Sequence, residues 1–215
     1  MPHIHTVNAL RQHFRNWVMK GIAPPPSVWP RLEKGDLVDA TKAAMGFPTI
    51  PGLPTTVPTN FIMPTFDYDW GPDFNYNDGS GVPTKMPPPI KQVINMKVPR
   101  VNADGNEVGG VPVVLQDAPL GTYLGWNITA GGARPFHDGQ ICNYVGSMIP
   151  FAKTKAERDA SGDTRLSLVE RYRDHDGYVA AVKSAATKAV AQGFLLQADA
   201  DLLINQADAS EVLRP

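Results

Sequence analysis

The side chains best suited to acid–base chemistry in this 215-residue chain are its five histidines, which are His3, His5, His13, His137 and His175. None of them lies at metal-ligand spacing on a predicted helix, and the His-x-His at residues 3–5 is a weak metal signal. His137 precedes Asp138 in the turn-rich stretch RPFHDG, a loop position from which an imidazole could act as a general base. Adjacent side chains usually point apart, so a structural role for His137 is the stronger interpretation.

Nucleophiles are harder to find than bases. The chain contains no Gly-x-Ser-x-Gly, the motif that places a catalytic serine on a sharp strand–helix turn. Ser147 lies in GSMIP, which lacks the second glycine, and Ser80 in DGSGV indicates a turn. Cys142 is the only cysteine, which excludes an internal disulfide and favours a small buried apolar residue. Phosphate-loop, dinucleotide and zinc-protease motifs are also missing, so we expect no cofactor.

One stretch, VNADGNEV, has the oxygen spacing of a cation loop. Asn102, Asp104 and Asn106 place oxygen donors two residues apart, with Glu107 beside them. A full calcium loop needs more acidic residues and a bidentate glutamate at its end. Between two β-branched runs, Asp-Gly is more typical of a hairpin turn, because both residues tolerate positive φ. We therefore favour a turn and keep the three residues as a candidate cation loop.

The composition excludes several classes of partner. The formal net charge is −1 and the basic residues are scattered, so we expect binding to neither nucleic acid nor membrane. The chain is 42% apolar, enough for a buried core, but no run of about 18 apolar residues predicts a transmembrane helix. The first residues lack the apolar centre of a signal peptide. The compartment stays open, and a secreted or periplasmic full-length parent is compatible with the sequence.

The first element expected is a helix over residues 7–20. Gly21 and Pro24 are typical of its end. Large apolar side chains recur at helical spacing and form one face: Leu10, Phe14, Trp17 and Val18. Such a face ordinarily packs into a core, yet few residues precede this helix.

Three zones follow, and together they predict an α+β fold. Residues 22–90 are rich in proline and glycine but also in aromatics, which favours an ordered irregular wrap over disorder. These aromatics more simply anchor the wrap than stack on sugars. Residues 91–150 are β-rich, and we expect a small antiparallel sheet within 91–128. Its predicted strands are VINMKVPRV and GGVPVVLQ, joined by the Asp-Gly turn, and GTYLGWNI.

Residues 151–215 are predicted to be helical. Asp174 or Asp176 begins a helix that ends at Gly193, and a last short helix starts at Asp199. One face of the longer helix is formed by Tyr178, Val182, Ala185, Ala186 and Ala189. Alternating charges favour an ion-pair network over an active site in this zone; its members are Arg158, Asp163, Arg165, Glu170 and Arg171.

Six stretches, in this order, resemble one family: LRQHFRNWVMKGIAPPPSVWPRLEKGDLV, FPTIPG, VPRVNADGNEVGGV, APLGTYLGWN, GSMIPFAKTKAERDASGDTRLSLVERY and GFLLQADADLLI. From about Leu10 to about Leu203, the chain resembles the C-terminal portion of the bacterial and fungal alpha/beta hydrolase domain-containing proteins. The stretch RPFHDGQIC departs from that pattern, so the resemblance implies no function there.

The resemblance implies where the chain sits in a hydrolase. In an α/β-hydrolase the catalytic serine, acid and histidine follow in that order, and a terminal helix comes after the histidine loop. Residues 1–21 look like that terminal helix, which places the sheet, nucleophile and acid upstream of Met1. Residues 22–215 would then be a C-terminal extension. His3 and His5 are the remaining candidates for the catalytic base, although they lie close to the helix.

Two functions follow from these expectations. The first is the C-terminal part of an esterase-type hydrolase that acts on a small-molecule ester but lacks a complete active site of its own. The alternative is a non-catalytic module that binds a partner protein or a carbohydrate through its aromatic segment. Without an upstream sheet, the apolar face of the helix over 7–20 is expected to be poorly packed or used for self-association.

Overall fold

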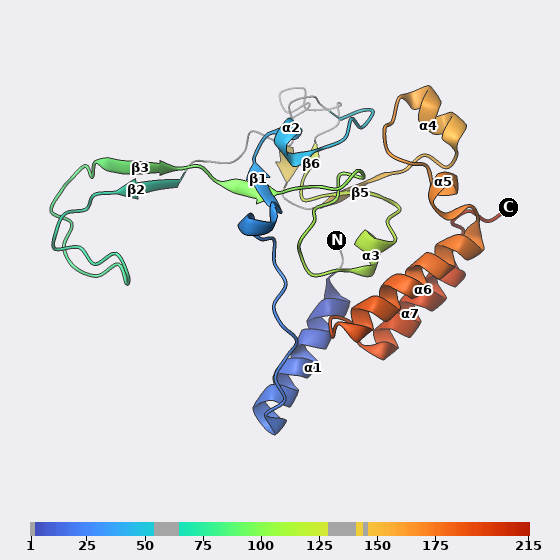
Figure 1. Ribbon diagram of the computed structural model, residues 1–215, viewed down its shortest axis with the longest axis horizontal. Helices are drawn as coiled ribbons and strands as arrows, with labels where there is room; N and C mark the ends of the chain where they lie inside the picture. The colour runs from blue at the N-terminus through green and yellow to red at the C-terminus, as the bar shows by residue number, and fades with distance from the viewer. Residues whose placement is uncertain (1–2, 54–64, 129–140, 144–145) are drawn as a thin grey trace.

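The computed structural model describes residues 3–53, 65–128, 141–143 and 146–215 of the chain. The fold is α+β, as predicted, with short strands in the middle of the chain and helices at both ends (Figure 1). The helices are α1 (Ile4–Lys20), η1 (Leu32–Lys34), α2 (Lys42–Met45), α3 (Val114–Asp117), α4 (Lys155–Ser161), α5 (Leu168–Tyr172), α6 (His175–Ala191) and α7 (Gln197–Asp208). The strands are β1 (Leu37–Asp39), β2 (Thr65–Tyr68), β3 (Ile90–Ile94), β4 (Lys97–Pro99), β5 (Gly121–Leu124), β6 (Asn127–Ile128), β7 (Ile141–Asn143) and β8 (Ser147–Pro150).

The predicted antiparallel sheet is present as four separate two-stranded pairs. They are β1–β4, β2–β3, β5–β8 and β6–β7, all antiparallel. Two strands of the pairs, β1 and β2, come from the zone predicted to be irregular, which also contains η1 and α2. The described strands therefore form no single sheet within 91–128, because their partners lie far away in the sequence.

The strand predicted in GGVPVVLQ was wrong. Gly109 takes a left-handed backbone conformation at φ 85°, and Pro112 has no N–H to donate to a strand ladder. The end of the stretch forms the short helix α3 instead. The turn before it is present, but only one antiparallel bridge, between Val101 and Glu107, closes it.

Strands β2 and β3 form an arm that projects from the body of the molecule (Figure 1). Every residue of β3 is exposed. Five aromatic rings follow one another in contact along the arm, with successive centroids 5.2–5.8 Å apart: Phe66, Tyr68, Trp70, Phe74 and Tyr76. Because the rings pack mainly on each other, they stabilise a hairpin that has no core beneath it.

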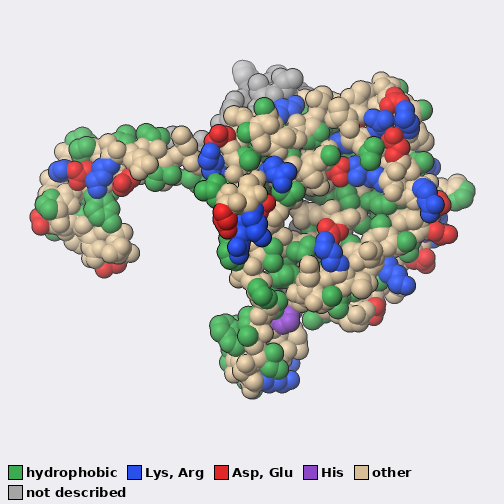
Figure 2. All heavy atoms as spheres, in the orientation of Figure 1, with side chains coloured by type: hydrophobic (Ala, Val, Ile, Leu, Met, Phe, Trp, Pro, Cys, Tyr) green, Lys and Arg blue, Asp and Glu red, His purple; other side chains and the backbone are tan. Residues whose placement is uncertain are grey.

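Helix α1 also extends away from the body, and its apolar face has no cover (Figures 1 and 2). It begins three residues earlier than predicted and ends at Gly21, whose φ of 68° suits the left-handed cap. Only Ala9 is buried in this helix. The predicted apolar face is exposed, with relative accessibilities of 44% for Leu10, 64% for Phe14, 54% for Trp17 and 66% for Val18. No described helix has the length and apolarity needed to cross a membrane.

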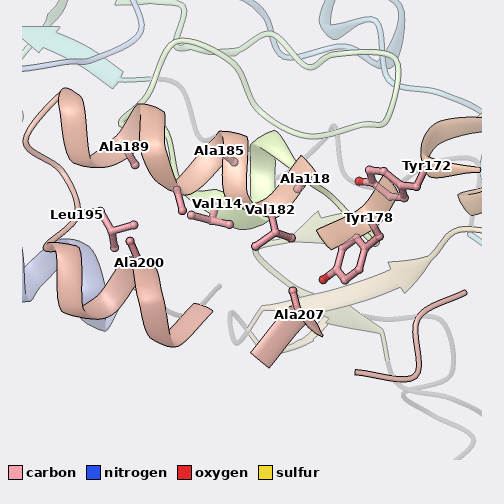
Figure 3. Packing of buried hydrophobic residues seen from close by; sticks show 11 residues of the cluster. Val114, Ala118, Tyr172, Tyr178, Val182, Ala185, Ala189, Leu195, Ala200 and Ala207 are labelled. Carbon is pink, nitrogen blue, oxygen red and sulfur yellow. The ribbon is translucent and has the colours of Figure 1, made fainter. Parts of the chain in front are cut away.

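The main core lies between α3, α5, α6 and α7 (Figure 3). Asp174, one of the two predicted cap residues, caps α6 by accepting a hydrogen bond from the Gly177 N–H. All five residues of the predicted α6 face are buried, and the three alanines among them let neighbouring elements pack closely. Helix α7 begins at Gln197, two residues before the predicted start. A second, smaller core joins Phe47, Ile50, Val101 and Leu124.

Replacing Gly177 by alanine tests how closely the start of α6 packs against the end of α5. Alanine favours helices over glycine by about 1 kcal/mol. A Cβ at this position, however, would lie 1.8 Å from the carbonyl oxygen of Tyr172. We therefore expect Gly177→Ala to lower the free energy of unfolding by about 1–3 kcal/mol in urea denaturation. Gly110→Ala is the matched control, since its Cβ meets nothing within 4 Å, and it should be close to neutral.

The predicted ion-pair network is present and part of it is buried. Arg165 is 2% exposed, and its guanidinium bonds the Asp163 carboxylate, the Thr122 hydroxyl and the carbonyl oxygens of Ile149 and Pro150. Burial alone would raise the pKa of Asp163, but the hydrogen bonds and charge of Arg165 hold that pKa below its usual range. The guanidinium thus ties the β5–β8 pair to the segment that leads into α5. Two further pairs surround it, Arg158–Glu170 and Arg171–Asp104.

Candidate functional site

The described residues bring one histidine against a carboxylate. His5 lies in the first turn of α1 and Asp199 in the first turn of α7, with Nδ1 and Oδ1 3.1 Å apart. Asn8, about one turn further along α1, donates from Nδ2 to the other oxygen of Asp199 at 3.3 Å. The imidazole is turned so that its buried Nδ1 does not meet hydrogen-bond geometry with the carboxylate. The pair has the residue types of a base and its orienting acid, but not their alignment.

A cavity of about 280 Å³ lies beside this pair. Its walls come from the start of α1, the segment leading through α3, and the facing sides of α6 and α7. Most of the lining is apolar, including Val114, Ala118, Val182, Leu195 and Ala207. The polar side chains at the cavity are His5, Thr6, Tyr178 and Gln206.

No serine or cysteine side chain from the described residues lines this cavity, so the His5–Asp199 pair has no nucleophile there. Thr6 carries a hydroxyl, but it follows His5 directly in a helix, where successive side chains diverge by about 100°. Ser147, the serine weighed from the sequence, lies in β8 and donates its hydroxyl to the Trp126 carbonyl oxygen at 2.8 Å. The geometry therefore provides a possible base and acid without the group they would activate.

The other histidines do not join the pair. His3 precedes α1, makes no side-chain cap bond, and lines a separate surface hollow near Glu107. His137 lies outside the described residues. His13 bonds to the Gly193 carbonyl oxygen at 2.8 Å, which ties α1 to the turn after α6. His175 bonds two backbone carbonyl oxygens near the C-terminus.

The candidate cation loop has the geometry of the favoured turn. Asn102 Oδ1 accepts hydrogen bonds from the backbone N–H groups of Asp104 and Asn106. Arg171 pairs with the Asp104 carboxylate through both of its terminal nitrogens. The Asn106 side chain is buried, donating to the Gly121 carbonyl oxygen and accepting from Tyr123 N–H. All three oxygen donors thus face protein groups.

The turn at residues 102–106 also connects other elements of the fold. Its residues bond both β5 and α5, so the turn links a strand pair to the helices that follow. Across the described residues, no cluster of three or more histidine, cysteine, aspartate or glutamate side chains has the arrangement to hold a metal ion.

A comparison with protein families adds one finding to this geometry. The family model described as "Alpha/beta hydrolase domain" matches residues 1–205. The chain belongs to the alpha/beta hydrolase domain family. No curated protein and no solved structure is similar enough to the chain to count as a match.

For this alpha/beta hydrolase domain chain, sequence reasoning found one half of the site. It selected His5, but it assigned Asp199 only a helix start, and it gave no indication of the cavity. The proximity of Asn8 and His5 on α1 to Asp199 depends on how two helices at opposite ends of the chain pack. The sequence signal for the cavity was the set of small residues on the α6 face. Small side chains allow a neighbouring helix to approach closely, and they leave an empty space where the neighbour's side chains are small as well.

Proposed function

We propose that this chain is the C-terminal part of a carboxylic-ester hydrolase and that it lacks a complete active site of its own. The observation that supports this most is the uncovered apolar face of α1. Leu10, Phe14, Trp17 and Val18 are all exposed within the chain. Apolar patches of this kind on soluble proteins usually mark an interaction surface. In a member of the alpha/beta hydrolase domain family, the natural cover for a terminal helix is the face of the central sheet.

The position of the cavity suits such a role. It lies at the start of α1, so a hydrolase core docked on that helix would lie close to His5 and to the cavity. The chain would then provide part of the wall of a cleft for a small-molecule ester, while the core provides the nucleophile and its acid.

The first test is hydrolysis of short acyl esters of p-nitrophenol. We expect the 215-residue chain alone to show no turnover above background, because its described residues place no nucleophile beside a base. Ser147→Ala should change nothing, since that hydroxyl is bonded to a backbone carbonyl oxygen. A longer protein that includes an upstream Gly-x-Ser-x-Gly segment should hydrolyse the same esters. Turnover by the chain alone that disappears in Ser147→Ala would contradict the proposal.

A non-catalytic binding module is the second candidate, and the projecting β2–β3 arm is the observation that favours it. Tyr76 at the end of the row of rings is 49% exposed, and β3 presents the exposed side chains of Ile90 and Val93. Neighbouring rings in the arm contact each other at interplanar angles of 37–83°, so together they form no continuous flat surface for a sugar. The arm therefore suits a protein partner better than a carbohydrate.

A further inference from the structure

The cavity between α3, α6 and α7 has the shape and chemistry of a ligand site. We propose that it binds a small uncharged molecule with an apolar body and one hydrogen-bonding end, such as an ester or an alcohol. The inference concerns binding in the chain as it stands and does not rest on the proposed hydrolysis.

The size of the cavity sets the size of the ligand. Its volume of about 280 Å³ is close to twice that of an engineered cavity of about 150 Å³ that stays dry and binds benzene. It lies just below the range for natural small-molecule pockets, about 300–1,000 Å³. An aromatic ring with a short substituent, or an aliphatic chain of similar volume, would fit. The exposed side chain of Gln206 marks the mouth.

The wall of the cavity includes the hydroxyl group of Tyr178. Tyr178 is 7% exposed, and its hydroxyl makes no hydrogen bond with the described residues. Figure 3 shows this hydroxyl directed toward the part of α7 that carries Ala207. The neighbouring Tyr172, by contrast, donates its hydroxyl to the Pro119 carbonyl oxygen at 2.7 Å. The Tyr178 hydroxyl is not among the fully enclosed unpaired atoms of the described residues, so its oxygen keeps some accessible surface at the cavity. A ligand oxygen in the cavity could therefore form a hydrogen bond with it.

The hydroxyl stays protonated under ordinary conditions. Burial raises the pKa of Tyr178, with the nearby Tyr123 adding to the shift. A protonated phenol can donate to a carbonyl or hydroxyl oxygen of the ligand, and it can also accept from an alcohol. The site therefore recognises a neutral oxygen group.

The charges around the cavity argue against an anionic ligand. Among the residues that the structure describes, no lysine or arginine contributes to its lining. His5 is the only side chain there that can carry a positive charge, and it already lies 3.1 Å from the Asp199 carboxylate. A carboxylate ligand would enter an apolar space beside an existing negative charge, without a cation of its own. We therefore expect discrimination between an ester and the acid of the same skeleton.

The test compares methyl 3-phenylpropionate with 3-phenylpropionate at pH 7.5, using amide chemical shifts of the ¹⁵N-labelled chain. We expect the ester to bind with a Kd of about 0.1–1 mM, a range suited to a ligand of this size. The shifted amides should cluster in α3, α6 and α7. The anion should bind at least about tenfold more weakly, because it has no cation to pair with. Equal affinities, shifts elsewhere or no binding of the ester would overturn the proposal.

Two variants of the cavity and one control complete the test. Ala207→Leu adds bulk to the lining and should abolish ester binding, whereas Ala198→Leu, an exposed position on the same helix, should leave it unchanged. Tyr178→Phe keeps the space but removes the hydroxyl, and should weaken ester binding about 5–10-fold. Circular dichroism checks that each variant is folded. Unchanged affinity in folded Ala207→Leu would show that the ligand binds elsewhere.

Discussion

Replacing Arg165 by methionine is expected to lower the free energy of unfolding by about 3–5 kcal/mol, the usual cost of removing one partner of a buried ion pair. Methionine keeps much of the side-chain volume but removes the charge. The variant would leave the Asp163 carboxylate, 7% exposed, without its cation. It would also remove the donor that holds the Thr122 hydroxyl and the Ile149 carbonyl oxygen. Urea denaturation followed by circular dichroism measures the loss.

Arg158→Met is the matched control for this prediction. Arg158 pairs with Glu170 at 2.9 Å, but the pair is more open to solvent, with side chains 18% and 21% exposed. Because part of this pair remains solvated, the control should cost less than Arg165→Met, about 1–2 kcal/mol. Equal losses in the two variants would show that Arg165 acts through general surface charge instead of through its buried contacts.

The same pair predicts how stability depends on pH. The pKa of Asp163 is lowered in the folded chain, so its contribution is fully present above the unfolded value of about 3.9 and is lost as pH falls through the folded value. The native chain should therefore lose this stabilisation only in acid. Arg165→Met removes the cause of the shift, so the stability lost by the variant relative to the native chain should shrink as pH falls below about 4.

The second large effect concerns the exposed face of α1. The double variant Phe14→Glu, Trp17→Glu should change the free energy of unfolding of the isolated chain by less than about 0.5 kcal/mol, because both side chains are exposed. In a longer protein with the hydrolase core, the same change should be severe. Each large apolar side chain contributes about 1.5–3 kcal/mol when buried, so docking of the helix should weaken by about 100-fold or more. Ester hydrolysis by the longer protein and its unfolding transition report the loss.

Gln12→Glu is the control for α1. It is exposed on the same helix, on the side opposite to Trp17, and it should leave both the isolated chain and the longer protein unaffected. The isolated native chain should also associate with itself at high concentration, which sedimentation velocity would detect, and the double variant should not. A loss of more than about 2 kcal/mol in the isolated double variant would mean that this face is covered within the chain itself.

Local patterns in the sequence predicted the longer helices α1, α6 and α7, but not the four-residue helices α2 and α3. The apolar face of α6 needed only a period of 3.6 and an aspartate cap, and all its predicted residues are buried. The end of α1 needed only Gly21 and the prolines after it. The strands are different, because a three-residue strand such as β1 acquires its structure from a partner distant in sequence. Sequence periodicity cannot identify that partner. The pairing of β1 with β4 and the pairing of β2 with β3 were therefore not predicted.

The candidate site was predictable only in part, for the same reason. His5 could be selected by its residue type. Asp199 belongs to the site only because α1 and α7, which lie near opposite ends of the sequence, are in contact in the folded chain. For residues 102–106, the choice between a turn and a cation loop depends on which group pairs with the Asp104 carboxylate. That group is the Arg171 side chain, which lies 67 residues further along the chain. The cavity depends on how side chains from several elements pack together, so no sequence motif predicted it.

The pairing of β1 with β4 also affects how the chain folds as it is made. Lys97 and Asp39, which form an ion pair across these two strands, are 58 residues apart. At synthesis rates of about 5–20 residues per second, β1 waits about 3–12 seconds for its partner to leave the ribosome. Helices α6 and α7, which are neighbours in sequence, can pair almost as soon as they emerge. The edge of β1 is therefore unpaired for several seconds during synthesis, whereas α6 has almost no such interval before α7 can cover it.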